Sequence, residues 1–238
     1  MEIDTAFPWT NDIDEAIQLQ GDLRERLMLT WDDRTVSTIG GIDVSCTGTS
    51  VLAAIAVFRY PDLTRLGTVT GEAPQGFPYI PGLLAFRVGP AILSTWEKLS
   101  HKPDLILIHG HGIAHPRGLG LASHVGLWLN LPTIGIAKTR LYGIQAEAGP
   151  NINEWSELLD EDDPKRVIGA VLRTQVNTKP VYVSAGHLID LPHAIRFVLA
   201  CCRGNRMPEP IRAAHMVAVR GQLQAHAKHG LVQNDRIV

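Results

Sequence analysis

The sequence predicts a single α/β domain in which a mixed β-sheet is flanked by helices. Two observations carry this prediction. Runs rich in Val, Ile and Thr, separated by turn residues, come early in the chain, and short apolar runs alternate with helical segments later. A chain of 238 residues suits one large domain, and it contains no repeat and no Gly/Ser-rich linker. We therefore expect residues 1–238 to form one domain.

The first third of the chain predicts a helix and then an antiparallel meander. Residues 14–29 place Ile17, Leu23 and Leu27 near helical spacing, which is typical of an amphipathic helix. Three extended runs follow, and the short turns between them favour antiparallel pairing. These runs cover residues 35–46, 50–60 and 64–72.

The rest of the chain alternates helices with short strands. We predict helices over 90–99, with Pro90 near the first turn, and over 119–129, 191–202 and 209–224. Strands are predicted over 104–108, 133–136, 167–174 and 181–184, and the acidic segment 151–163 is predicted as a surface excursion with a short helix. Strands joined by helical crossovers run parallel. This element order is that of the ribonuclease H-like fold.

Composition limits the classes of function. The formal net charge of −2 argues against binding nucleic acid through bulk positive charge, but it permits a local site with a small basic rim. The acidic start of the chain lacks the pattern of a secretory signal, and no run approaches the ~20 apolar residues that span a bilayer. An odd number of cysteines without CxxC spacing argues against a disulfide framework and a thiolate zinc site. We expect a cytoplasmic protein without a membrane partner, and favour a monomer.

Asp43 is the first candidate for chemistry, in the segment GGIDVSC of the first predicted strand. Strand alternation places it on the face opposite Ile42 and Val44. An Asp on a solvated strand face would be unremarkable. However, Asp is disfavoured in strands, and one flanked by apolar residues in a central strand favours a functional role.

The segment FPYIPG, residues 77–82, predicts a stiff loop because prolines restrict the backbone on both sides of Tyr79. A rigid loop that presents a tyrosine can act as a wedge, which replaces a base in the stack while that base is expelled. The alternative is a tyrosine packed against the core beneath the loop.

Histidines and glycines follow the buried strand at 104–108, in the run DLILIHGHGIAHPRGLGLASH. Sites in open α/β sheets gather at the carboxyl ends of strands, and glycines let a ligand approach the backbone. His109, His111, His115 and His124 are candidate metal ligands, proton shuttles or phosphate contacts. Lys138, after the next strand, and His215, on the last helix, are weaker candidates taken alone.

Several of these stretches together resemble the endonuclease V family, which nicks DNA near deoxyinosine. The matching text appears in the family's order and spans roughly residues 40–220. It comprises GIDVS, FPYIPGLLAFR, HGIAHPR through GLASH, LPTIGIAKTRLYG, VIGAVLRT, AGHLID and PEPIRAAH. The resemblance implies metal-dependent hydrolysis of the second phosphodiester 3′ of the inosine in deoxyinosine-containing DNA, with inosine-containing RNA as the alternative substrate.

The resemblance also implies catalytic roles for individual residues. Asp43 corresponds to the carboxylate that binds the catalytic metal, and His109 stands at a second metal position. Lys138 and His215, together with His115, correspond to basic residues around the scissile phosphate.

The same resemblance implies a set of nucleic-acid contacts. Tyr79 corresponds to the wedge that enters the duplex where the inosine leaves it. The remaining contacts correspond to the loop around the extruded base and to the backbone next to that base. They are Ile80, Pro81, Gly82, Leu83, Gly110 and Gly112.

Two positions depart from the family pattern. Val88 stands where the family has a metal-binding Glu, and His109 stands where it has an Asp. Mg²⁺ is the family's cofactor and prefers oxygen ligands, whereas imidazole suits transition ions and can accompany a carboxylate on Mn²⁺. We therefore expect an endonuclease with weakened activity or with a preference for Mn²⁺ or another transition ion. The alternative is a homologue that binds inosine-containing or distorted nucleic acid without cutting it.

Overall fold

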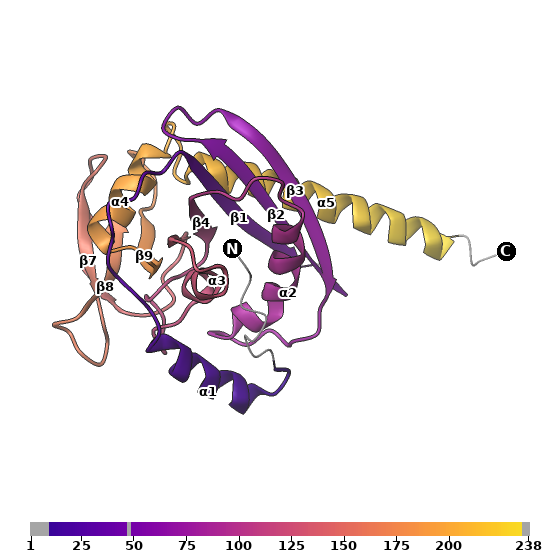
Figure 1. Ribbon diagram of the computed structural model, residues 1–238, viewed down its shortest axis with the longest axis horizontal. Helices are drawn as coiled ribbons and strands as arrows, with labels where there is room; N and C mark the ends of the chain where they lie inside the picture. Colours follow the sequence, from indigo (N-terminus) through magenta and orange to yellow (C-terminus); the bar gives the residue numbers. More distant parts are fainter. Residues whose placement is uncertain (1–9, 47–48, 235–238) are drawn as a thin grey trace.

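A mixed sheet forms the centre of the computed structural model, which describes residues 10–46 and 49–234, with side chains described as far as residue 221. Helices cover both faces of this sheet, and α5 runs on beyond its edge (Figure 1). The strands are β1 (Thr38–Cys46), β2 (Ser50–Arg59), β3 (Arg65–Pro74), β4 (Leu105–His109), β5 (Thr133–Ala137), β6 (Ile144–Gln145), β7 (Trp155–Leu159), β8 (Val167–Leu172) and β9 (Val181–His187). The helices are α1 (Ile13–Arg24), α2 (Leu84–Glu97), α3 (Leu121–Leu129), α4 (Leu191–Ala200) and α5 (Glu209–Asn234).

The strand order confirms the predicted fold class. It is β3-β2-β1-β4-β5-β9-β8-β7-β6, so the meander forms one side of the sheet. Strands β1, β4 and β5 run parallel, as their helical crossovers require. Strand β9 returns antiparallel to β5, and β8 and β7 continue that antiparallel half.

Two apolar cores lie on opposite faces of the sheet, and strand alternation assigns each residue to one of them. In β4, Leu105 and Leu107 pack with α4 and α5, whereas Ile106 and Ile108 pack with α2 and α3. The next residue of β4, His109, therefore belongs to the α5 side. The same alternation turns Asp43 toward α5, because Ile42 lies in the core beneath α2 and α3. The sequence predicts that these two residues face opposite sides of the sheet.

Helix α2 begins at Leu84, six residues before the predicted start at 90. Pro90 therefore lies inside the helix, where the missing N–H costs about 3 kcal/mol in an ordinary context. Pro90 is exposed, whereas Val88, Ala91 and Ile92 are fully buried against the sheet. Burial of this apolar face outweighs the local penalty of the proline.

The acidic segment 151–163 contains a strand where a short helix was predicted. Strand β7 pairs antiparallel with β8, and Leu158 is fully buried in a small core beneath it. A second unforeseen strand, β6, pairs with the far end of β7. Pairing with strands that are distant in the sequence determined the secondary structure of this region. Such pairing is not visible in the local sequence pattern.

Helix α1 ends at Arg24, five residues before the predicted end at 29, and its buried face shares only Leu23 with the predicted one. The buried side chains are Ala16, Gln20 and Leu23, whereas Ile17 is 40% exposed. Asp12 caps the helix by accepting a hydrogen bond from the Glu15 backbone N–H at 2.9 Å. A glutamine thus occupies the centre of the buried stripe.

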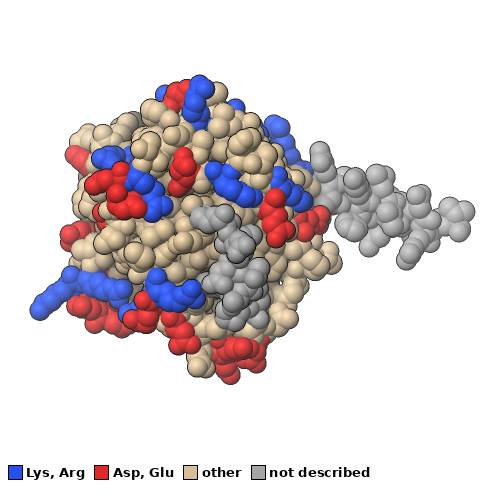
Figure 2. All heavy atoms as spheres, viewed as in Figure 1, with Lys and Arg blue, Asp and Glu red and all other residues tan. Residues whose placement is uncertain are grey.

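Lys and Arg are interspersed with Asp and Glu on the face shown in Figure 2. Among the residues that the structure describes, no helix is long and apolar enough to cross a membrane. The three cysteines, Cys46, Cys201 and Cys202, form no disulfide bond.

Candidate functional site

Asp43, His109 and His215 come together although they belong to three different elements. Strands β1 and β4 are parallel neighbours with Ile42 opposite Ile108, so the following residues, Asp43 and His109, lie side by side. Helix α5 approaches β1 very closely at Gly41, where a Cβ atom would lie 2.1 Å from the Pro210 backbone. This approach brings His215 over the same carboxylate.

Both histidines bond to the Asp43 carboxylate, one on each oxygen. Nδ1 of His109 lies 2.9 Å from Oδ1, and Nδ1 of His215 lies 2.6 Å from Oδ2. Asp43 is 4% exposed, and the two imidazole rings stand nearly perpendicular. One potential ligand atom from each residue lies within 4.8 Å of the other two. We call Asp43, His109 and His215 the Asp–His–His group.

Burial raises the pKa of Asp43, but the hydrogen bond and charge of His109, with the hydrogen bond of His215, lower it by more. The net effect holds the Asp43 pKa below its ordinary value. The carboxylate is therefore an anion at neutral pH, which is the form that binds a cation.

The donor set of this group fits a transition ion better than Mg²⁺. It offers one carboxylate and two imidazoles, whereas Mg²⁺ prefers oxygen ligands in octahedral geometry. Two other acidic residues that could have supplied oxygen are engaged elsewhere. Asp104, at the opposite end of β4, accepts hydrogen bonds from Ser37 and Thr38, and Glu72 accepts one from Ser50. Val88 is fully buried in the core on the α2 side.

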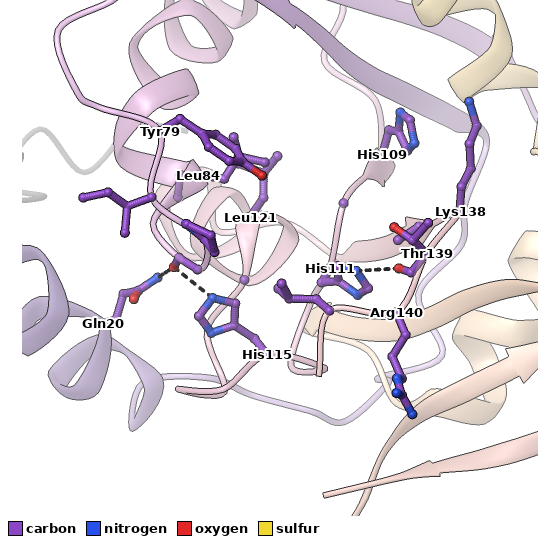
Figure 3. Close-up of a pocket in the computed structure, with 18 residues that line it drawn as sticks. Gln20, Tyr79, Leu84, His109, His111, His115, Leu121, Lys138, Thr139 and Arg140 are labelled. Atoms are coloured by element: carbon purple, nitrogen blue, oxygen red, sulfur yellow. Dashed lines mark hydrogen bonds between the residues drawn. The ribbon is translucent and has the colours of Figure 1, made fainter. Parts of the chain in front are cut away.

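A cavity of about 440 Å³ borders this group at the carboxyl ends of β4 and β5. Figure 3 shows Tyr79 on one side of it and His109, Lys138 and Arg140 on the other. Of the sites predicted from the sequence, it is lined by Tyr79, Ile80, Pro81, Gly82, His109, Gly110, His111, His115 and Lys138. The structure thus collects most of the predicted nucleic-acid contacts around one hollow.

Two predicted contacts lie outside this cavity, in packing positions. Leu83 is 1% exposed and packs with Ala16, Phe77 and Phe86, so its side chain belongs to a core. Gly112 has no room for a side chain because a Cβ atom would lie 2.0 Å from the Ala185 carbonyl oxygen. Close packing explains both residue types, and neither lines the cavity.

Tyr79 is presented to solvent, which excludes the alternative that it packs in the core. Its side chain is 70% exposed, and the Arg87 guanidinium lies over its ring at 5.9 Å. Arg87 also donates a hydrogen bond to the Phe77 carbonyl at 3.0 Å. Arg87 therefore connects this loop to α2.

His115 is a buried, neutral side chain that links two loops, and it is not an exposed basic group. Its Nε2 bonds to the Gly82 carbonyl at 2.9 Å, and its Nδ1 accepts the Arg117 backbone N–H at 3.1 Å. Burial, followed by the charge of Arg117, lowers the His115 pKa to about 4. Both ring nitrogens of His115 are thus occupied in holding loops together, and its role at the phosphate stays a prediction.

Lys138 fits the role of a cationic contact. It follows β5 directly, it is exposed, and it borders both the main cavity and a smaller hollow of about 230 Å³ beside His109 and His215. The Arg206 guanidinium fixes its backbone by donating to the Lys138 carbonyl at 2.7 Å and to the Pro180 carbonyl at 2.8 Å. His111 bonds through Nε2 to the Thr139 carbonyl at 3.1 Å.

The residues of this site that were not foreseen include Gln20, Arg117 and Arg206. Gln20 carried one usable signal, since it lies four residues after Ala16 and three before Leu23, on the buried face of α1. Arg117 and Arg206 carried none, because both act through backbone carbonyls of distant segments.

Comparisons with known proteins match this chain to one family. The sequence model of the family described as Endonuclease V matches residues 21–216. Endonuclease V of Trichormus variabilis is 46% identical over 222 residues, which cover 92% of this chain and 99% of the relative. The crystal structure of endonuclease V from Streptomyces avermitilis superposes with a TM-score of 0.85 at 36% identity, covering 94% of this chain and 98% of that one.

A ligand-bound structure is also similar. Endonuclease V of Ciona intestinalis, in complex with a 24mer DNA containing an inosine followed by a ribo-adenosine, has a TM-score of 0.77 at 25% identity. The match covers 90% of this chain and 98% of that one.

Proposed function

This chain belongs to the endonuclease V family, and from that premise we propose that it is a metal-dependent endonuclease acting on deoxyinosine in DNA. It extrudes the inosine base and hydrolyses the second phosphodiester bond on the 3′ side. The observation that carries the proposal is the buried Asp43 carboxylate, held by His109 and His215 at the rim of a cavity that Tyr79 overlooks.

Recognition rests on the cavity and its loop. The exposed ring of Tyr79 can take the place of a base in the stack, which lowers the cost of extruding that base. The cavity beside it is lined by Gly82 and Gly110, whose lack of side chains lets a planar base approach the backbone. The DNA bound by the Ciona relative supports this assignment.

For the metal, we propose Mn²⁺ or another transition ion in preference to Mg²⁺, with weak cutting in Mg²⁺. Asp43 would supply the anionic ligand, with His109 and His215 as imidazole ligands. A bound ion would activate water and stabilise charge on the phosphate. Lys138, exposed at the edge of both hollows, is placed to bind a phosphate oxygen next to this group.

A nicking assay on a deoxyinosine duplex in Mn²⁺, in Mg²⁺ and in EDTA tests the proposal, with a gel shift on the same duplex in EDTA. We expect binding in EDTA, strong nicking in Mn²⁺ and weak nicking in Mg²⁺. Binding without nicking in any ion would instead assign a recognition module. An inosine-containing RNA run in parallel decides between the two nucleic acids.

The double variant Val88→Glu with His109→Asp provides the complementary test. It places carboxylates at the two positions where the sequence departs from the family pattern. We expect Mg²⁺-dependent nicking to rise relative to Mn²⁺-dependent nicking, because oxygen ligands suit Mg²⁺. An unchanged ratio in a folded variant would remove ligand chemistry as the cause of the metal preference.

A further inference from the structure

The loop that borders the cavity depends on one carbonyl group. Gly82 has a backbone φ of +85°, a conformation that glycine adopts easily. Its carbonyl oxygen accepts hydrogen bonds from Gln20 Nε2, His115 Nε2 and Arg117 Nη2, each at 2.9 Å. A carbonyl oxygen has two lone pairs, so three donors saturate it.

Gln20 connects these donors to each other. Its Oε1 accepts a hydrogen bond from Arg117 Nε at 2.5 Å, and its Nε2 also donates to the Leu119 carbonyl at 3.0 Å. The Gln20 side chain is 1% exposed and thus has little access to water. It joins α1, the loop at Gly82 and the segment leading into α3, as Figure 3 shows for the bonds at Gly82.

We propose that Gln20 is a positioning residue for substrate recognition, which holds the loop 79–82 in the conformation that receives the extruded base. This inference rests on the proposed function. Gln20 lies one residue before the segment that matches the family model, which begins at residue 21. Gln20 also lines the cavity, so the proposal adds this part of α1 to the base-binding site.

The physical reason is preorganisation. A loop held in its binding conformation loses less entropy when the base enters, so affinity rises without a new contact. Without the Gln20 amide, the Gly82 and Leu119 carbonyls each lose one hydrogen bond, and the half-buried Arg117 guanidinium loses an acceptor. We expect the loop to sample other conformations and the affinity for inosine duplex to fall about tenfold.

Four proteins test the inference: wild type, Gln20→Ala, Gln20→Glu and Gln18→Ala. Gln20→Glu keeps an acceptor for Arg117 and removes both donated bonds, so it isolates the donor role. Gln18→Ala is the matched control, since Gln18 is an exposed glutamine of the same helix. The readouts are hydrogen exchange of residues 77–84 in the free protein, Kd for an inosine duplex in EDTA, and the nicking rate at saturating duplex.

We expect faster exchange of residues 77–84 and a Kd raised about tenfold in both Gln20 variants, with an unchanged saturated nicking rate and an unaffected Gln18→Ala. Unchanged exchange and Kd in both Gln20 variants would overturn the inference. So would a rise in exchange spread equally over α1 and α3 with an unchanged Kd, which indicates a purely structural role. If wild type does not bind the inosine duplex, the proposed function fails, and an unchanged loop exchange then rejects the positioning role separately.

Discussion

Nδ1 of His215 lies 2.6 Å from Oδ2 of Asp43, although 172 positions separate the two residues in the chain. The bond joins α5 to the first strand of the sheet and completes a group whose other member, His109, follows a buried apolar strand. The metal chemistry that we propose depends on this long-range arrangement.

Asp43→Asn is expected to abolish metal-dependent nicking, by at least about 10²-fold, because the Asp–His–His group loses its anionic ligand. Isothermal titration with Mn²⁺ should show a parallel loss of metal binding. Asp22→Asn makes the same charge change at an exposed residue of α1 and serves as control. Mn²⁺ affinity equal to wild type in Asp43→Asn would place the metal elsewhere.

Val88→Glu alone is expected to lower the free energy of unfolding by more than about 2 kcal/mol, because it buries a carboxylate in an apolar core. Val88 is fully buried there with Ile92 and Ala91. Val176→Glu, the same substitution at a valine that is 48% exposed, should change stability by no more than about 0.5 kcal/mol. Urea titration measures both, and equal effects would contradict the burial assigned to Val88.

Gly82→Ala and Gly21→Ala are expected to change the stability of the folded protein in opposite directions. At Gly82, φ is +85° and a Cβ atom would lie 2.6 Å from Arg117 Nη2, so alanine should destabilise by about 1–3 kcal/mol. At Gly21, inside α1, a Cβ atom meets nothing within 4 Å, so alanine should stabilise by about 0.5–1 kcal/mol. Thermal denaturation should show the two shifts, and a neutral Gly82→Ala would remove the strain argument.

Stability is expected to fall as the pH drops from about 6.5 toward 3, because buried histidines must be protonated. Burial, then the charge of His115, lowers the His124 pKa to about 3, and burial, then Arg26 and Arg34, lowers that of His187 to about 4. In this window the unfolded chain binds more protons than the folded one, so stability rises with pH.

The slope of that pH profile provides the test. His124→Gln removes one buried titrating group and should flatten the curve of melting temperature against pH. The matched change His101→Gln, at an exposed histidine, should leave the slope as in wild type. Equal slopes in all three proteins would show that His124 does not contribute to acid sensitivity.

The local sequence pattern was sufficient to predict most of the helices and strands and part of the site. The meander, the buried strands β4 and β5, and the opposite orientation of Asp43 and Ile42 follow from two-residue alternation and turn residues, which act over short distances. The stiff loop around Tyr79 follows from its prolines in the same way.

By itself, the sequence determined the fold class, the family resemblance and the absence of a carboxylate at Val88 and His109. The tertiary structure alone decided which residues meet. It started α2 at Leu84, paired β7 with β8, and buried Gln20 against Gly82. These outcomes depend on packing and hydrogen bonding between segments far apart in the chain, and such contacts leave no periodic signal in either segment.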